Sequence, residues 1–422
     1  MLELFPETAA VEDGELTIAG IPATDLAEDY GTPLLVYDEQ TIVEAARAYR
    51  AAAPNAFVAY GVKAFPNVGV LKLLAAEGLG ADVATLGELT IALRAGLQGD
   101  RLIVHGNNKS SEELEAAARA GAWLVVLDAP DEVERASDAG VTRVLVRVTP
   151  GVEADTHPSI RTAHHGSKFG LPPEQALEAL ARAQAAGLEV AGLHVHIGSQ
   201  LLDDSAAIET VEWLAGFADR CRQELGWTPG IVDLGGGLGI QYVPGHVPPP
   251  IGEFVGTLVR HLDVQWESLG LPSPRLVIEP GRSIVGRAGI TLYEVGSVKA
   301  VADGMTYVSV DGGMSDNPRP QLYQAQYTAL LANRADGSPN GTYAVCGKHC
   351  ESGDVLIRHV ALPEPTRGDL LAVPATGAYT LTMASNYNLV PRPAAVLVSD
   401  GEARLIRRRE TIEDLLATEP AE

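Results

Sequence analysis

The 422-residue chain is poor in cysteine, in lysine and in aromatic side chains. Its three cysteines, Cys221, Cys346 and Cys350, are too few for a disulfide framework or for a four-thiolate metal site. We therefore expect a reduced, intracellular compartment, and the predicted location is the cytoplasm.

Positive charge is also scarce, because 31 Lys and Arg residues stand against 55 Asp and Glu residues, for a net charge of −24. A chain this acidic is repelled by nucleic acid and by anionic membranes, so neither partner is expected. The sequence has no run of 18 apolar residues and no basic segment leading into an apolar one. These two absences predict a chain without a membrane span or a targeting signal.

From residue 57 onward, short apolar runs alternate with helical patterns. The expected strands are Phe57–Lys63, Ala81–Ala84, Leu102–His105, Leu124–Asp128, Val144–Val148, Gly192–Ile197, Ile231–Leu234 and Leu276–Glu279. The expected helices lie near 40–52, 67–77, 86–95, 111–120, 130–138, 173–186, 205–225 and 251–268. This alternation predicts βαβ units and a parallel sheet. Eight units over about 225 residues favour a (β/α)₈ barrel over an open doubly wound sheet.

After Arg282 the pattern changes to short strands separated by turns, with no long helix before 411–417. The expected strands are Thr291–Val301, Thr306–Val310, Thr342–Val345, Val355–Leu362, Leu370–Val373 and Ala394–Val398. They predict a C-terminal antiparallel β-sandwich or small β-barrel. We place the (β/α)₈ barrel at 33–285 and the β domain at 1–32 and 286–422, with a short strand at Glu15–Ile18 joining the latter.

Polar residues stand where the apolar barrel strands end. In barrels of this kind the active site lies at the C-terminal ends of the strands. The residues at these ends are Lys63, Asp82, His105, Asp128, Arg147, His196, Gly235, Gly236, Gly237 and Glu279. The sequence therefore predicts a site at this end of the barrel.

Lys63 is one of only six lysines, and it closes the apolar run 57–60. A lysine at the mouth of a buried strand is costly unless it is paired or used covalently. One interpretation is a Schiff-base lysine whose amine is kept partly neutral by desolvation. The other is an amphipathic lysine whose stem is buried and whose head reaches solvent.

Two loops at the strand ends suit an anionic ligand. Gly235-Gly236-Gly237 follows the seventh strand, where such barrels often bind phosphate, although a plain tight turn is the alternative. A dinucleotide loop is not expected, because no helix opens after it. Glu279-Pro280-Gly281-Arg282 follows the eighth strand. Glu279 suits a cationic ring nitrogen and Arg282 a carboxylate, and an ordinary turn is again the alternative.

His194 and His196 form an H-x-H pair. A metal pair would need further ligands that the pattern does not provide, so we expect no metal and interpret a histidine here as a ring stacked on a planar cofactor or as a core residue. Further candidates lie in the C-terminal part. Cys350 and Glu351 occupy a loop that is either a turn or a lid over a site, and polar-aromatic loops carry Arg319, Tyr323 and Tyr379.

Taken together, ten segments resemble the fold-type III pyridoxal-phosphate-dependent decarboxylases. They occur in the family's order from about residue 30 to 392: YGVKAFPN, GADVAT with GEL, VRVTPGVEADTHP, SKFG, GLHVHIGSQ, DLGGGLGI, EPGR, DGGMSDNPRPQLY, GKHCESGD and TGAYTLTMASNYN. The resemblance implies pyridoxal 5′-phosphate as cofactor and an amino acid as substrate. Within the family, the segments imply decarboxylation of meso-diaminopimelate to L-lysine and carbon dioxide, the last step of lysine biosynthesis.

The resemblance also implies residue roles. Lys63 would bind the cofactor covalently, His196 would stack on its ring, and Glu279 would keep the ring nitrogen protonated, which favours decarboxylation. Residues implied to hold the phosphate are Ser199, Gly236, Gly281 and Tyr379. Residues implied to support the lysine and the ring are Asp82, Glu88 and Arg147. Residues implied to bind the far end of the substrate are Arg282, Arg319, Tyr323, Glu351 and Tyr379.

Cys350 is similar to the family cysteine that reaches the cofactor from the partner subunit and takes part in protonation. This implies a homodimer with shared active sites. Gly61, Phe65, Lys348 and His349 depart from commoner residues of the family, and none of them carries a nominated chemical role.

Three alternatives stay open at this stage. The nearest is a relative acting on ornithine, arginine, carboxynorspermidine or a siderophore intermediate, and Arg319, Tyr323 and the Cys350-Glu351 sequence argue for a substrate with a second carboxylate instead. The others are a non-catalytic binding protein and a metal-dependent barrel hydrolase.

Overall fold

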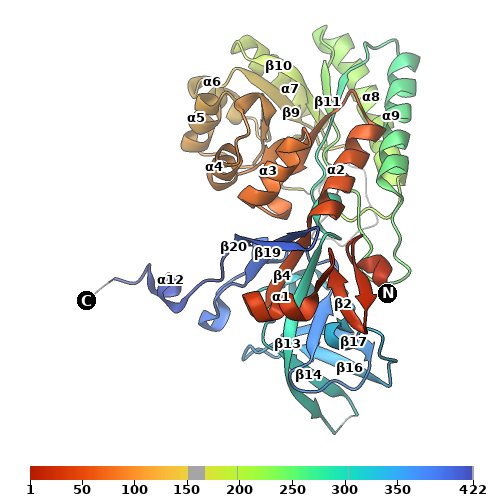
Figure 1. Cartoon of the computed structure of the whole chain (residues 1–422). Coiled ribbons are helices and arrows are strands. Elements are labelled where there is room, and N and C mark those ends of the chain that lie inside the picture. Colours follow the sequence, from red (N-terminus) through yellow and green to blue (C-terminus); the bar gives the residue numbers. More distant parts are fainter. Residues whose placement is uncertain (151–166, 197, 303, 421–422) are drawn as a thin grey trace. The chain divides into compact units, whose positions relative to one another are not determined.

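The computed structural model describes residues 1–150, 167–196, 198–302 and 304–420. The chain divides into two compact units, shown in Figure 1. The β unit comprises Met1–Ile42, Ile240–Val247 and Ile284–Glu422, and the barrel unit comprises Val43–Gly239 and Pro248–Ser283.

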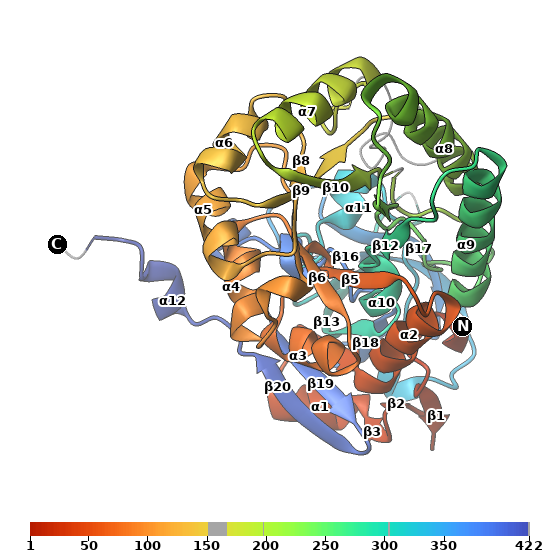
Figure 2. The ribbon, with the colours of Figure 1, turned by 90° about the horizontal axis from the view of Figure 1, so that it is seen from above.

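In the barrel unit, eight parallel strands close into a ring with helices outside it (Figure 2). The ring closes where β12 pairs with β5, with Val277 beside Phe57. The predicted barrel is confirmed, and its strands end slightly earlier than the apolar runs. The strands are β5 (Phe57–Gly61), β6 (Gly80–Val83), β7 (Leu102–Val104), β8 (Leu124–Leu127), β9 (Arg143–Arg147), β10 (Glu189–His194), β11 (Ile231–Asp233) and β12 (Arg275–Ile278).

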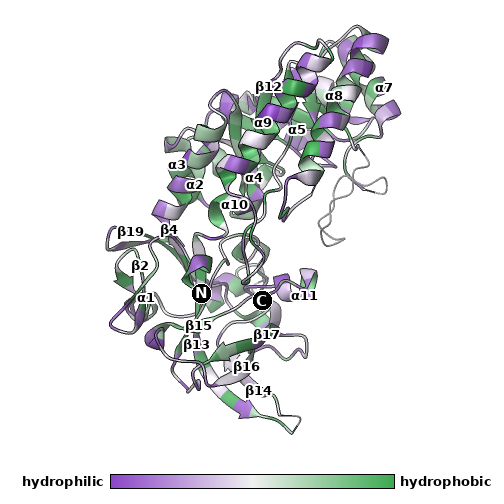
Figure 3. Cartoon of the chain, turned by 90° about the vertical axis from the view of Figure 1, so that its right-hand side faces the viewer, coloured by the Kyte–Doolittle hydropathy of each residue, from purple (hydrophilic) through white to green (hydrophobic). Residues whose placement is uncertain are grey.

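Three helices of this unit begin at a capping side chain, α3 at Asn67, α4 at Thr85 and α5 at Ser110. Asn67 accepts hydrogen bonds from the amides of Gly69 and Val70 at the start of α3, and Ser110 opens α5 with a capping box. Figure 3 shows hydrophilic and hydrophobic residues interspersed along these helices, as amphipathic packing requires. The helices are α2 (Glu39–Ala52), α3 (Val68–Ala76), α4 (Leu86–Arg94), α5 (Ser111–Ala120), α6 (Glu132–Asp138), α7 (Pro173–Ala185), α8 (Ser205–Leu225) and α9 (Ile251–Ser268).

The β unit contains a nine-stranded, mostly antiparallel sheet with the order β17-β16-β14-β13-β4-β19-β20, in which β18 pairs with β13 and β15 pairs with β18. The predicted mostly antiparallel β fold is therefore confirmed. Its strands are β4 (Leu34–Asp38), β13 (Gly289–Ala300), β14 (Thr306–Val310), β15 (Leu330–Leu331), β16 (Gly341–Cys346), β17 (Val355–Leu362), β18 (Leu370–Val373), β19 (Ala394–Ser399) and β20 (Glu402–Arg407).

The N-terminal residues supply the rest of the β unit. They form a small sheet of β1 (Ala10–Glu12), β2 (Glu15–Ile18) and β3 (Ile21–Pro22), followed by the helix α1 (Ala23–Tyr30). The strand expected at residues 15–18 is present, whereas α1 was not predicted from the sequence. Short helices complete the chain: α10 (Arg282–Val285), α11 (Arg319–Tyr323) and α12 (Ile412–Leu416).

β4 is a central strand of the β unit although it lies near the N-terminus. It pairs in parallel with β19, with Leu34 beside Ala394, and antiparallel with β13 on its other side. All five of its residues are buried. The β unit therefore draws its core from both ends of the chain. Among the residues that the structure describes, no helix combines the length and the apolar character that a membrane crossing requires.

Candidate active site

The inward face of the barrel changes from apolar to polar along each strand. One layer of the barrel interior is filled by buried apolar residues, among them Ile103, Val126, Leu145, Ile231 and Val277. Because side chains on a strand alternate between its two faces, the residue two positions further on points the same way. The residues that follow by this rule, all buried, are His105, Asp128, Arg147, Asp233 and Glu279.

His194 joins this polar layer because of an irregularity in β10. The pairing of β10 with β9 shifts between Val190 and Gly192, so Ala191 is an extra residue on β10. An extra residue inverts the alternation that follows it. His194 then pairs with Arg147 on one side and with Asp233 on the other, and it shares their inward direction.

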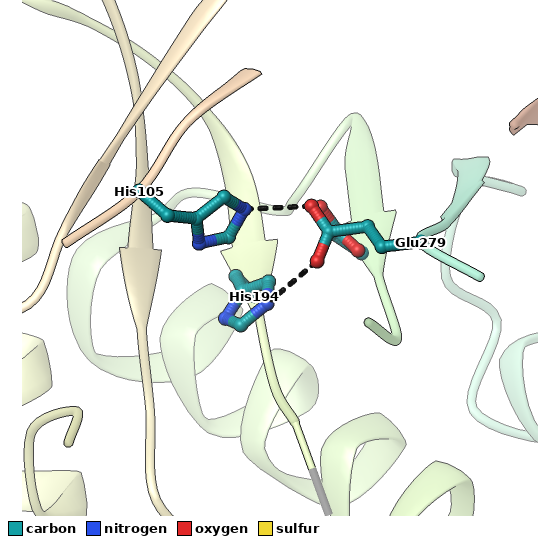
Figure 4. Close-up of side chains that lie close together, drawn as sticks. His105, His194 and Glu279 are labelled. Atoms are coloured by element: carbon teal, nitrogen blue, oxygen red, sulfur yellow. Dashed lines mark hydrogen bonds and ion pairs between the residues drawn. The ribbon is translucent and has the colours of Figure 1, made fainter. Parts of the chain in front are cut away.

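Glu279 is the centre of this layer. Its Oε1 lies 2.6 Å from Nε2 of His105, and its Oε2 lies 3.5 Å from Nε2 of His194, as Figure 4 shows. Burial favours the neutral acid, but the interactions with His105 and His194 outweigh it and hold the pKa of Glu279 well below its ordinary value. The residue is therefore a buried carboxylate.

The neighbours of Glu279 are held in neutral forms. Burial lowers the pKa of His194 to about 3. Burial and the adjacent charge of Glu279 raise the pKa of Asp233 well above its ordinary value. Both shifts favour the neutral forms of these two neighbours, so Glu279 is the anion that a cationic ligand would meet.

The same four residues could also hold a metal ion, since one ligand atom from each of His105, His194, Asp233 and Glu279 lies within 4.8 Å of the others. Two ligands of one tetrahedral zinc ion lie about 3.3 Å apart, given bonds of about 2.0 Å. The 2.6 Å between His105 and Glu279 is the length of a hydrogen bond instead. The absence of a metal stays a prediction.

Lys63 follows β5 in a short 3₁₀ turn, Val62–Ala64, with its side chain 53% exposed. Because β5 ends at Gly61, the lysine projects beyond the strand and is more exposed than the desolvated interpretation assumes. Its Nζ lies 3.9 Å from Oδ2 of Asp82, which is buried. Burial raises the pKa of Asp82, against the attraction of His105.

Glu88 and Asp128 contact neighbouring residues near the ends of the barrel strands. Glu88 accepts a hydrogen bond from the amide of Ala84 at 2.7 Å, and burial raises the pKa of its carboxyl. Asp128 lies 3.2 Å from Nη1 of Arg147, whose guanidinium also covers the ring of Phe169 at 4.7 Å. Both residues thus have structural partners, consistent with supporting roles.

The glycine loop leaves no room for side chains. A Cβ on Gly236 would lie 2.4 Å from the carbonyl oxygen of Glu279, and Gly235 and Gly237 have φ values of +65° and +133°. The amide of Gly236 lies 3.3 Å from Nδ1 of His196, which is half-buried. The loop thus brings backbone amides close to the ends of β10 and β12.

Further candidate residues follow two other strands. Gly281 and Arg282 follow β12, and Ser199 follows β10. A Cβ on Gly281 would lie 3.1 Å from Cβ of Ala64, so Gly281 allows the chain to pass the turn that carries Lys63. Arg282 is buried and donates to Oγ of Ser199 at 2.9 Å. The barrel unit therefore brings together Lys63, Asp82, His196, Ser199, Gly236, Glu279, Gly281 and Arg282 from separate strand ends.

Arg319 and Tyr323 lie on α11 of the β unit. Arg319 is buried, hydrogen-bonds the hydroxyl of Tyr327 and lies 4.3 Å over the ring of Tyr242. Tyr323 is half-buried, with its hydroxyl 4.0 Å from the sulfur of Met383. Arg319 thus has an aromatic enclosure that the sequence did not indicate.

Cys350 and Glu351 occupy an exposed loop between β16 and β17. The amide of Cys350 donates to Oδ1 of Asn388 at 3.2 Å. The preceding residue, His349, is buried, and its ring lies 2.8 Å from Oγ of Ser315. Tyr379, in another loop of this unit, is half-buried with a φ of +59°. The loop that presents the thiol is therefore anchored at its base.

Comparisons with known proteins agree with this arrangement. The pyridoxal-binding domain of the pyridoxal-dependent decarboxylases matches residues 39–286. A protein of Mycobacterium tuberculosis named diaminopimelate decarboxylase is 47% identical over 98% of this chain and 96% of its own length. A protein of Bacillus subtilis with the same name is 43% identical over 96% and 95%.

A solved structure shares the fold. Diaminopimelate decarboxylase from M. jannaschii, crystallised with L-lysine, has a TM-score of 0.92 and 34% identity, covering 99% of this chain and 98% of that one. Lysine/ornithine decarboxylase from Vibrio vulnificus, crystallised with putrescine, has a TM-score of 0.78 and 25% identity, covering 89% and 97%. The chain therefore belongs to the family of pyridoxal-dependent decarboxylases.

Proposed function

We propose that this enzyme removes one carboxylate from meso-diaminopimelate and releases L-lysine and carbon dioxide, with pyridoxal 5′-phosphate as its cofactor. The observation that carries the cofactor is the buried carboxylate of Glu279, which pairs with His105 at the end of the barrel strands. The near-full-length similarity to proteins named diaminopimelate decarboxylase supports the substrate.

The residues of the barrel unit fit the cofactor. A protonated ring nitrogen would match the anionic Glu279, whose neighbours Asp233 and His194 are neutral. Gly236 must be a glycine, because a Cβ there would collide with the carbonyl oxygen of Glu279. A loop without side chains can offer its backbone amides to a phosphate. The bound cofactor would supply an electron sink for the electrons left when carbon dioxide departs.

Each nominated residue then has a defined task. Lys63, whose Nζ lies 3.9 Å from Oδ2 of Asp82, would hold the cofactor covalently. Glu279 holds a proton on the ring nitrogen, which strengthens the electron sink. His196 covers the ring. Ser199, Gly236, Gly281 and Tyr379 would hold the phosphate. Arg282 is a further cofactor contact, and Asp82, Glu88 and Arg147 would support the lysine and the ring.

The β unit supplies the substrate contacts in this proposal. Arg282 from the barrel unit and Arg319, Tyr323, Glu351 and Tyr379 bind the far carboxylate and amino group of the substrate. Two arginines suit a substrate that carries a second carboxylate. In this proposal the substrate loops and a dimer interface belong to the β unit, which also contains residues 33–42 that the sequence assigned to the barrel domain.

The assembly we propose is a cytoplasmic homodimer with shared active sites. The exposed thiol of Cys350 stands on a loop whose base is fixed by Asn388 and Ser315. A thiol presented in this way is suited to reach the site of a partner subunit and to deliver a proton to the carbon that has lost its carboxylate.

Release of carbon dioxide from meso-diaminopimelate, L-ornithine, L-arginine and carboxynorspermidine, with and without pyridoxal phosphate, tests the proposal. We expect turnover of diaminopimelate only in the cofactor-loaded enzyme, with L-lysine as product. Absence of this turnover from cofactor-loaded protein would refute the proposed substrate. The second candidate is decarboxylation of lysine or ornithine, which the similarity to the V. vulnificus enzyme favours; preferential turnover of ornithine would establish it.

A further inference from the structure

Lys109 is a lysine buried inside the barrel unit, with 2% of its surface exposed. It lies in the loop between β7 and α5. Its Nζ donates to the carbonyl oxygens of Gly106 and Val126, at 2.6 and 2.7 Å, and lies 3.0 Å from the carboxylate of Glu132. Three acceptors match the three hydrogens of an ammonium group. Burial lowers the pKa of Lys109, and the attraction of Glu132 opposes that shift.

Glu132 is fully buried at the start of α6. Its Oε2 accepts hydrogen bonds from the backbone amides of Asp128 and Ala129, at 2.6 and 3.3 Å. The Lys109–Glu132 pair therefore connects the loop after β7 with the loop after β8. Each of these loops continues a strand whose end carries a polar residue of the candidate site.

The lysine end of the pair leads to Glu279. Gly106 directly follows His105, which contacts Glu279 at 2.6 Å. Gly106 has a φ of +124°, and a Cβ there would lie 3.1 Å from Cγ of Lys109, so this glycine makes room for the lysine stem. By holding the carbonyl of Gly106, Lys109 fixes the backbone that carries His105.

The glutamate end leads to Arg147. Glu132 holds the amide of Asp128, whose Oδ2 lies 3.2 Å from Nη1 of Arg147 and whose Oδ1 accepts from the amide of Gly170 at 2.8 Å. Arg147 belongs to the same inward layer as His105. One buried pair thus fixes the ends of β7 and β8, which present His105 and Asp128.

Stability alone does not account for this arrangement. Removing two charges from water is costly, and an apolar pair of similar volume is often at least as stabilising. What the ion pair adds is direction, because each charged group binds particular backbone atoms with fixed geometry. Side chains that orient a site in this way are costly to lose even though they touch no ligand.

We propose that Lys109 and Glu132 are positioning residues for the cofactor site, a role that rests on the proposed function. They hold the backbone at His105 and Asp128, so that His105 meets Glu279 and Asp128 meets Arg147. Neither residue touches cofactor or substrate.

Two double variants of the full-length enzyme distinguish the contribution of the lysine end of the pair from that of the glutamate end. Lys109→Met with Glu132→Gln removes both charges while the glutamine carbonyl can still hold the amide of Asp128. Lys109→Met with Glu132→Leu removes both ends. Neither variant leaves an unpaired buried charge, which is the change most apt to prevent folding. The single variant Glu132→Asp is a milder third form, because it keeps a carboxylate near Lys109 while the shorter side chain loses its hold on the amides of Asp128 and Ala129.

The matched control is an exposed pair on the adjacent helix. Arg119 and Glu115 of α5 lie 3.3 Å apart with side chains 66% and 53% exposed. The variant Arg119→Met with Glu115→Gln removes the same kinds of charge from an exposed pair. We expect it to match the wild-type enzyme in every measurement.

Three quantities are measured below the melting temperature of each variant: the Kd of pyridoxal phosphate, the absorption spectrum of the bound cofactor, and kcat and KM. We expect the Met/Leu variant to bind the cofactor about 10-fold more weakly, with a shifted spectrum. We expect its kcat to fall about 10- to 100-fold while KM changes much less, since a small misplacement of site groups costs this much. The Met/Gln variant should lie between it and the wild type.

Folded variants with wild-type Kd, spectrum and kcat would overturn the positioning role. If neither double variant folds, the same measurements on Glu132→Asp decide, and wild-type values there also overturn it. A wild-type enzyme that binds the cofactor but turns over no diaminopimelate would refute the proposed substrate, whereas the Kd and the spectrum would still test the pair.

Discussion

Nε2 of His105 lies 2.6 Å from Oε1 of Glu279, and this contact joins the ends of β7 and β12 across the barrel. Both side chains are buried. The histidine occupies one carboxylate oxygen and leaves the other near His194, at 3.5 Å. A carboxylate held in this way has a fixed direction, which is what recognition of a ring nitrogen requires.

Replacing Glu279 by Gln should weaken cofactor binding on the order of 10-fold and lower kcat on the order of 100-fold. The reason is that a neutral glutamine no longer favours a protonated ring nitrogen. Cofactor titration of the apoenzyme and carbon dioxide release measure the two effects. Glu267→Gln, an exposed change on α9, is the control. Wild-type affinity and turnover in Glu279→Gln would contradict the assignment.

Replacing Lys63 by Ala should abolish the absorbance of covalently held cofactor and almost all turnover, because no other group then bonds to it. Lys72→Ala changes an exposed lysine of the neighbouring helix α3 and should leave both unchanged. Borohydride reduction followed by peptide mapping locates the modified residue. Cofactor fixed to any of the other five lysines would show that the site is assigned wrongly.

Replacing Cys350 by Ala should leave cofactor affinity unchanged and remove most turnover. In the proposal the thiol delivers a proton to the carbon that has lost its carboxylate and does not contribute to cofactor binding. The control is Cys346→Ala, at the end of β16, which keeps Cys350 and its loop. Full activity of Cys350→Ala would remove the proposed role of this loop. Mixing Cys350→Ala with Lys63→Ala tests shared sites, since mixed dimers should regain part of the activity only if the two residues act across subunits.

Asp316 should make the β unit less stable as the pH rises. Burial raises the pKa of this carboxyl to about 7, against the hydrogen bonds from Tyr293 and Gly313. The native state then keeps a proton that the unfolded chain releases near pH 4, so this group's contribution falls between about pH 4 and 7, by up to about 4 kcal/mol.

Urea unfolding of the β unit at pH 5 and pH 8 measures this dependence. Asp316→Asn should remove much of the difference between the two pH values, whereas the exposed Asp336→Asn should keep it. An unchanged difference in Asp316→Asn would mean that the carboxyl is ionised throughout this range.

The barrel and the strand-end residues were predictable because their signals are local. Apolar runs end on polar residues, and a position such as Asp82 or Glu279 follows from the strand to which it belongs. The role of His194 was not predictable, since the extra residue at Ala191 has no mark in its local sequence. The partner of His105 was not predictable either, because it is brought near only when β12 closes the ring onto β5.

Three further differences have local causes. The helix α1 buries only Ala23 and Leu26 and carries several acidic residues, so its apolar pattern is too weak to recognise. Lys63 was expected to be desolvated because the apolar run was taken to continue to it, but pairing ends at Gly61. The ion pair of Lys109 and Glu132 gave no signal, since each residue alone resembles an ordinary surface charge.

The position of β4 has a consequence for the order in which the chain folds during synthesis. Its two neighbours, β13 and β19, lie after the whole barrel in the sequence, so β4 leaves the ribosome with both edges unpaired. Domains fold as they emerge, and the barrel strands are complete at residue 278. The barrel can thus form while β4 is still without its two neighbouring strands. A chain terminated before Ala394 would keep a buried strand without its parallel partner, and such an exposed edge invites aggregation.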